Sequence, residues 1–148
     1  GSLIQRKGLD LLLPALAKTP QNIRLWIVGE GQEKDLLQKQ CTELKISDRV
    51  EFLGYQEGEP LQKLYRTADA FVLPTREDCF GLVLLEAMCA SLPIISSKYA
   101  DGARDLVSDG ENGYIIDRKM WMVLRRQSKS CRRGYGICHG EKELRKGT

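Results

Sequence analysis

The chain has little of what hydrolases and metal-dependent enzymes use. Its single histidine is His139, so the residues before it offer no imidazole as a base or a metal ligand. That part of the chain therefore lacks a Ser/His/Asp or Cys/His catalytic set. The five cysteines show no C-x-x-C or other metal-ligand spacing. Because their number is odd and no signal peptide is recognisable, we expect reduced, intracellular thiols.

Long apolar runs are also missing. The longest are far shorter than the roughly 20 residues of a transmembrane helix, so we expect no membrane span. No G-x-G-x-x-G follows a strand, because Gly29-Glu30-Gly31 is too short for a dinucleotide fingerprint. The chain has 148 residues, enough for one domain with a buried core.

Charge is divided unevenly along the chain. Residues 1–117 hold 13 Lys and Arg against 18 Asp and Glu, whereas residues 118–148 hold 10 against 2. The formal net charge of +3 therefore originates in the C-terminal tail. We accordingly do not take the basic balance as a sign of nucleic-acid binding, and we expect no nucleic-acid partner.

Short apolar strands alternate with helices over residues 1–117, which is typical of a parallel α/β sheet covered on both faces. Leucines at i, i+3, i+4 and i+7 make residues 9–16 an amphipathic helix, in which Pro14 predicts a kink or a local opening. The predicted strands cover residues 23–28, 49–53, 70–73, 93–96 and 113–116. The other predicted helices cover residues 32–45, 61–67, 82–92 and 102–107.

Residues 75–92, TREDCFGLVLLEAMCASL, are the most informative stretch. Between Leu82 and Leu92 every residue is apolar or small except Glu86, which predicts a helix buried on nearly every side. A buried carboxylate is costly unless it finds partners. Glu86 is therefore either paired inside the protein or faces a cleft and holds a ligand. Asp78 could cap the same helix without any ligand.

The segment DCFGLVLLE resembles the acidic-x7-Glu motif of retaining glycosyltransferases with a GT-B fold, of the large family 4 type. Asp78 takes the first acidic place and Glu86 the second, and Phe80, Gly81, Ala87 and Met88 match the positions around them. The resemblance runs from about residue 3 to residue 117. It implies a Rossmann-like, doubly wound parallel sheet that forms the C-terminal, nucleotide-sugar-binding half of such an enzyme.

The resemblance also implies roles for single residues. Lys7, ahead of Gly8, matches the lysine of the family's Gly-Arg-Leu-x-x-x-Lys-Gly turn and would bind the diphosphate. Ser2 stands where that turn has an arginine, which Arg6 could replace. Asp78 would bind the hydroxyls of the donor sugar. Glu86 would accept hydrogen bonds from the two ribose hydroxyls, since both carboxylate oxygens are acceptors.

Backbone groups complete the implied donor site. The N–H groups of Gly81 and Leu82 open a helix and lack intrahelical partners, so with Phe80 they would face the phosphate or the sugar. The base would lie at the turn of Gly54 and Tyr55, where backbone contacts leave UDP, GDP and ADP indistinguishable. No metal or other cofactor is expected, since the nucleotide-sugar is a substrate. The acceptor, a glycan or a lipid-linked molecule, would bind a missing N-terminal domain. The resemblance implies a cytoplasmic enzyme, whose full-length form would make any peripheral contact with the inner face of the membrane largely through that domain.

Both ends of the chain depart from the family pattern. In a doubly wound sheet the first strand is central, and this chain begins where that strand should end. We therefore expect a fragment whose sheet lacks its central strand. One nucleotide string encodes KDVDGFAEAIEK, a family-like helix, in one frame and residues 119–130 of this chain one base later. We interpret residues 118–148 as an atypical, frame-shifted and poorly ordered tail, with a genuine basic tail as the alternative.

Three functions remain open. The first is the donor-binding half of a retaining hexosyltransferase in polysaccharide or glycolipid synthesis, inactive when isolated. The second is a nucleotide-sugar epimerase or a glycan phosphorylase of the same fold, although an epimerase site would be expected to contain histidines. The third is a catalytically inactive fragment or a nucleotide-binding module.

Overall fold

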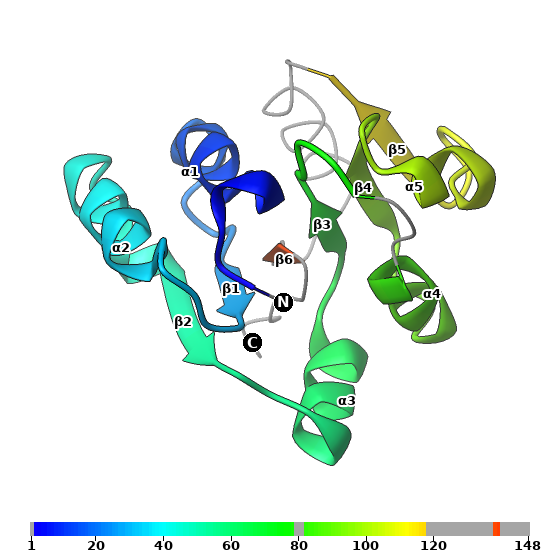
Figure 1. The fold of residues 1–148 in the computed structure, drawn as a ribbon, viewed down its shortest axis with the longest axis horizontal. Helices are drawn as coiled ribbons and strands as arrows, with labels where there is room; N and C mark the ends of the chain where they lie inside the picture. Colours follow the sequence, from blue (N-terminus) through cyan, green and yellow to red (C-terminus); the bar gives the residue numbers. More distant parts are fainter. Residues whose placement is uncertain (1, 79–81, 118–137, 140–148) are drawn as a thin grey trace.

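A computed structural model describes residues 2–78, 82–117 and 138–139 of the chain (Figure 1). Strands and helices alternate along these residues, as the sequence predicts. The helices are η1 (Gln5–Lys7), α1 (Leu9–Ala17), α2 (Lys34–Glu43), η2 (Ser47–Arg49), α3 (Gly58–Thr67), α4 (Leu82–Cys89) and α5 (Asp101–Leu106). The strands are β1 (Leu25–Val28), β2 (Val50–Gly54), β3 (Phe71–Leu73), β4 (Ile94–Ser97), β5 (Gly113–Ile116) and β6 (Cys138–His139).

The strands form one parallel sheet in the order β2-β1-β6-β3-β4-β5. From β1 the chain moves outward to β2, and from β3 it moves in the opposite direction to β4 and β5 (Figure 1). The strand order therefore reverses in the middle of the sheet. This is the doubly wound, Rossmann-like arrangement that the sequence predicts.

The centre of the sheet contains a strand that the sequence did not predict. We expected the central position to lack its strand, and there β6 lies between β1 and β3 (Figure 1). Ile27 is opposite His139, and Phe71 is opposite Cys138. Two residues of the basic C-terminal segment thus pair with the core strands. The division of the chain at residue 117 stays a prediction, since residues 118–137 and 140–148 lie outside the described part.

Apolar side chains cover both faces of the sheet, because successive residues of a strand point to opposite sides. On one face Ile27, Val72 and Ile95 pack with the leucines of α1 and with α2. On the other face Phe71 and Leu73 pack with residues of α3, α4 and α5. Leu9, Leu12, Leu13 and Leu16, the predicted apolar stripe of α1, are all buried.

Helix α1 runs from Leu9 to Ala17 with Pro14 inside it, and the kink or local opening expected at Pro14 stays a prediction. Proline removes the backbone donor for the carbonyl four residues earlier, that of Asp10. The side chain of Gln40, on the neighbouring α2, donates to this carbonyl at 3.0 Å. A contact between helices thus replaces the hydrogen bond that Pro14 cannot make.

Helix α4 is less buried than its composition suggests. Only Leu84 and Ala87 are buried along its length, whereas Leu82 is 63% exposed and Leu85 is 40% exposed. Glu86 is also exposed. The prediction of a helix buried on nearly every side was therefore wrong. One face of α4 packs on the sheet and the other is open, so Glu86 needs no partner to compensate for burial.

No helix in the described part of the chain is long and apolar enough to cross a bilayer.

Candidate functional site

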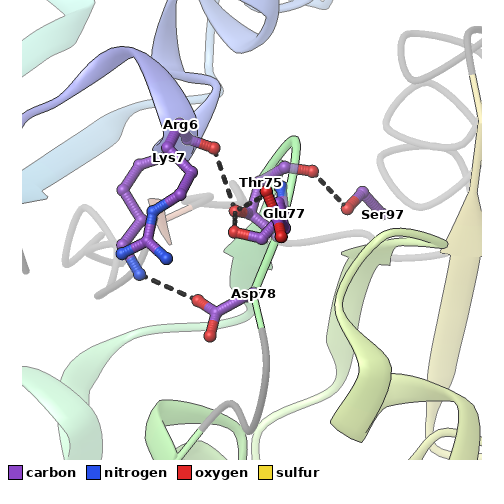
Figure 2. Close-up of polar contacts among 6 residues, drawn as sticks. All are labelled: Arg6, Lys7, Thr75, Glu77, Asp78 and Ser97. Carbon is purple, nitrogen blue, oxygen red and sulfur yellow. Dashed lines mark hydrogen bonds and ion pairs between the residues drawn. The ribbon is translucent and has the colours of Figure 1, made fainter.

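Two loops meet above the point where the strand order reverses. One comprises residues 4–8, before α1, and the other comprises residues 74–78, after β3. In open α/β sheets, ligands bind outside the carboxyl ends of the strands at this switch point. Figure 2 shows that the two loops contribute facing side chains from distant parts of the sequence. The fold therefore puts them where a ligand site is expected.

Gly8 allows the close approach of the two loops. Its φ of 72° is in the left-handed region, and it joins η1 to α1. A Cβ atom at this position would lie 2.0 Å from the carbonyl oxygen of Pro74. Only glycine fits without a backbone shift, because both the torsion angle and the space exclude a side chain. The Lys7-Gly8 turn identified in the sequence is thus fixed against the loop after β3.

Thr75 ties this loop to its neighbours on both sides (Figure 2). Its hydroxyl donates to the carbonyl of Arg6 at 3.0 Å, and Ser97 at the end of β4 donates to the Thr75 carbonyl at 2.6 Å. The amide of Arg76 also donates to the Arg6 carbonyl, at 2.7 Å. Thr75 is 1% exposed. Buried hydrogen bonds of this kind fix the positions of the two loops relative to each other.

Lys7 and Asp78 form an ion pair at the open end of this arrangement. The Lys7 Nζ atom lies 2.8 Å from Oδ2 of Asp78, and the two side chains are 20% and 15% exposed (Figure 2). The two predicted site residues, 71 positions apart in sequence, therefore meet directly. The pair is partly buried, so solvent screens it less than a surface pair. It offers a cation and a carboxylate side by side.

Arg76, in the loop after β3, forms a second link, to Asp10 in the first turn of α1. The guanidinium donates to both carboxylate oxygens at 2.7 Å, and it also donates to the carbonyl of Gln5 at 2.6 Å. The hydrogen bonds from Arg76 lower the pKa of Asp10 below its ordinary value, and those to Asp10 raise the pKa of Arg76. Sequence reasoning did not find this pair, because the partners are far apart in the chain and belong to no motif.

The lowered pKa of Asp10 predicts an acid-sensitive contribution to stability. A carboxyl group with a depressed folded-state pKa stabilises the fold above its unfolded pKa, and this stabilisation disappears as pH falls through the folded pKa. The difference in unfolding free energy between the native chain and Asp10→Asn should therefore shrink between neutral pH and about pH 3. Urea unfolding at both pH values measures it. Asp35→Asn, on the exposed side of α2, is the control. An unchanged difference at low pH would contradict the prediction.

A cleft of about 760 Å³ lies between α3 and α4. Glu86 and Leu82, two of the predicted site residues, belong to its wall, together with Tyr65, Arg66 and Cys89. Most of its other lining is apolar, including Leu61, Leu85 and Ala90. Ligand pockets of 300–1,000 Å³ commonly combine such an apolar wall with a few polar groups. The exposed face of α4 is thus the wall of a cleft.

Tyr65 is a site residue that sequence reasoning missed. Its hydroxyl donates to Oε2 of Glu86 at 2.9 Å, across the cleft from α3 to α4. The residue is 5% exposed, and its ring stacks with that of Phe71. A single tyrosine on the apolar side of a short helix looks like an ordinary core residue. The hydrogen bond of its hydroxyl to Glu86 is recognised only from the packing of α3 beside α4.

The remaining predicted residues are less closely connected. Gly54 ends β2 with a φ of 70°, and Tyr55 after it is 68% exposed. The Tyr55 hydroxyl donates to Glu57 at 2.9 Å, and this contact raises the pKa of Tyr55. Phe80 and Gly81 lie outside the described residues, so their predicted roles stay predictions. Ser2 forms an isolated bridge with Glu30, after β1.

Among the described residues, no cluster of three or more histidine, cysteine, aspartate or glutamate side chains could hold a metal ion.

Comparison with known proteins gives the site its context. The chain matches the family described as "Glycosyl transferases group 1" over residues 1–131. It is 34% identical, over 117 residues, to the lipopolysaccharide core biosynthesis glycosyltransferase LpsE of Rhizobium meliloti. That match covers 79% of this chain and 33% of LpsE. The chain thus spans about a third of the length of this curated relative.

Solved structures of similar proteins share the fold. The Anabaena protein HepE in complex with UDP superposes with a TM-score of 0.77 and 30% identity, over 88% of this chain and 37% of HepE. The apo form of the lipopolysaccharide outer core galactosyltransferase WaaB has a TM-score of 0.81 and 29% identity, over 88% of this chain and 39% of WaaB. Sheet order and these likenesses together define a Rossmann-like domain of the GT-B type. The chain belongs to the group 1 glycosyltransferase family.

Proposed function

We propose that this chain is the donor-binding half of a retaining glycosyltransferase that takes its sugar from a nucleotide-sugar. The nucleoside occupies the cleft between α3 and α4, and the diphosphate extends toward Lys7 and Asp78. The full-length enzyme transfers the sugar, of the hexose type, to a glycan or a lipid-linked acceptor bound by another domain. It works at the cytoplasmic side of the membrane.

The observation that carries this proposal is the position of Glu86. It is a carboxylate on the open face of α4, in the wall of a cleft whose volume suits a nucleoside. A carboxylate accepts hydrogen bonds from both hydroxyls of a vicinal diol, which is the feature that ribose offers. The binding of UDP by the neighbour HepE supports the same ligand class.

Lys7 supplies the charge that the reaction requires. When the bond between the sugar and the β-phosphate breaks, the nucleoside diphosphate leaves with the electron pair. A lysine at the phosphate stabilises this developing negative charge. Asp78, 2.8 Å from Lys7, accepts hydrogen bonds from hydroxyls of the donor sugar in this proposal. With Lys7 in this role the transfer proceeds without a metal ion.

Titration calorimetry of the chain with UDP, GDP and ADP tests the proposal. We expect weak but measurable binding of one diphosphate. Glu86→Gln keeps the size of the side chain but removes its charge and one acceptor oxygen. Its Kd should rise at least tenfold, about 1.4 kcal/mol, because hydrogen bonds to charged groups contribute about 1.5–3 kcal/mol each.

Glu43→Gln, an exposed carboxylate on α2, is the matched control and should leave binding unchanged. If Glu86→Gln binds the nucleotide as tightly as the native chain, Glu86 has no ligand role. If no nucleotide binds the native chain, it is an inactive fragment rather than a working donor domain. Nucleotide binding with Glu86 involved supports the proposal over that alternative.

A further inference from the structure

The hydrogen bond between Tyr65 and Glu86 joins a buried side chain to an exposed one. Tyr65 is buried, and its ring stacks with Phe71 at a centroid distance of 6.3 Å. Phe71 is itself 0% exposed in β3. The packing of the ring in the core therefore fixes the position of the Tyr65 hydroxyl, and Tyr65 also lines the cleft.

Glu86 has no such support from packing. It lies on the exposed face of α4, where a glutamate side chain samples many rotamers. Ordering a flexible side chain of this kind costs conformational entropy. The Tyr65 hydroxyl donates to Oε2 at 2.9 Å, so it favours one orientation of the Glu86 carboxylate. Each carboxylate oxygen can accept two hydrogen bonds, so Oε2 keeps a free lone pair and Oε1 keeps both.

We propose that Tyr65 is a positioning residue that holds the Glu86 carboxylate in the orientation that recognises a vicinal diol. It thereby makes the cleft selective for ribose over 2′-deoxyribose. The inference rests on the proposed function, in which Glu86 binds ribose. It adds that the selectivity depends on a residue that does not itself contact the sugar.

Two ligands and two substitutions test this inference. UDP and 2′-deoxy-UDP are titrated into the native chain, Tyr65→Phe, Glu86→Gln and the double variant. Tyr65→Phe keeps the ring and its stacking on Phe71, and removes only the hydroxyl. We expect it to raise the Kd of UDP three- to tenfold and to change the Kd of 2′-deoxy-UDP less than twofold. In the Glu86→Gln background the same substitution should have little further effect, because the group that it positions is already altered.

If Tyr65 had a purely structural role, Tyr65→Phe would raise the Kd of both ligands by the same factor. The ratio of the two Kd values therefore separates the two explanations. Tyr114→Phe, on β5 and outside the cleft, is the control for loss of a tyrosine hydroxyl. An unchanged ratio in Tyr65→Phe, with Glu86→Gln still weakening UDP, overturns the inference and leaves the proposed function intact. Absence of any effect of Glu86→Gln overturns both.

Discussion

Replacing Gly8 by alanine should destabilise the domain by about 3 kcal/mol or more. The left-handed backbone at Gly8 costs about 1–2 kcal/mol for any other residue. The new Cβ would also lie 2.0 Å from the Pro74 carbonyl oxygen and 2.9 Å from its carbon, both of which are backbone atoms. A flexible side chain could move away, but here the loops of residues 4–8 and 74–78 must separate. Urea unfolding measures the loss.

Gly110→Ala separates the two causes. Gly110 also has a positive φ, 83°, but a Cβ there would meet no atom within 4 Å. Gly110→Ala should therefore lose only the free energy of the unfavourable backbone conformation. Gly8→Ala should lose this and the free energy of the collision with Pro74 as well. If the two variants lose the same free energy of unfolding, the contact between Gly8 and Pro74 has no energetic importance. The same separation of loops would displace Lys7 from the position proposed for the diphosphate, so Gly8→Ala should also weaken nucleotide binding.

Local patterns in the sequence predicted the elements of this fold well. The four leucines of α1 gave its buried face, and the short apolar runs gave five strands of the sheet to within about two residues. The turn of Lys7 and Gly8 could be found because it resembles the family's Lys-Gly turn, and the φ of 72° shows why glycine stands there. The sixth strand, Cys138–His139, could not be found, because two residues carry no period and the neighbouring strands create its position.

The burial of α4 was misjudged for a different reason. Apolar composition predicts that a surface is removed from water, but it does not distinguish the core from the wall of a ligand cleft. Leu82 and Leu85 are exposed because α3 leaves a cleft beside them. Glu86 was recognised as unusual, yet its hydrogen bond to Tyr65 depends on how two helices pack. No local pattern in the sequence encodes such a contact.

The pairing of Lys7 with Asp78 was missed in the same way. Each residue was identified separately, one for the diphosphate and one for the sugar. The structure adds that they form an ion pair with each other. A diphosphate that binds Lys7 must therefore compete with the Asp78 carboxylate. This competition predicts opposite effects when the two residues are changed.

Lys7→Met should raise the Kd of UDP by roughly 10- to 150-fold, since a hydrogen bond to a charged group contributes about 1.5–3 kcal/mol. The variant loses the cation and leaves the Asp78 charge facing the phosphates. Asp78→Asn should instead bind UDP at least as tightly as the native chain, because Lys7 no longer has a competing carboxylate. Calorimetry with UDP and with uridine, which has no phosphate, measures both effects.

Uridine is the decisive comparison. If Lys7 binds the phosphates, Lys7→Met leaves the affinity for uridine unchanged. The control Lys39→Met, on the exposed side of α2, changes the affinity for neither UDP nor uridine. Equal weakening of UDP and uridine in Lys7→Met would mean that Lys7 supports the loops and not the ligand. Weaker UDP binding in Asp78→Asn would mean that the carboxylate holds Lys7 in place for the phosphate. Asp78 would then act on the diphosphate through Lys7 as well as on the sugar.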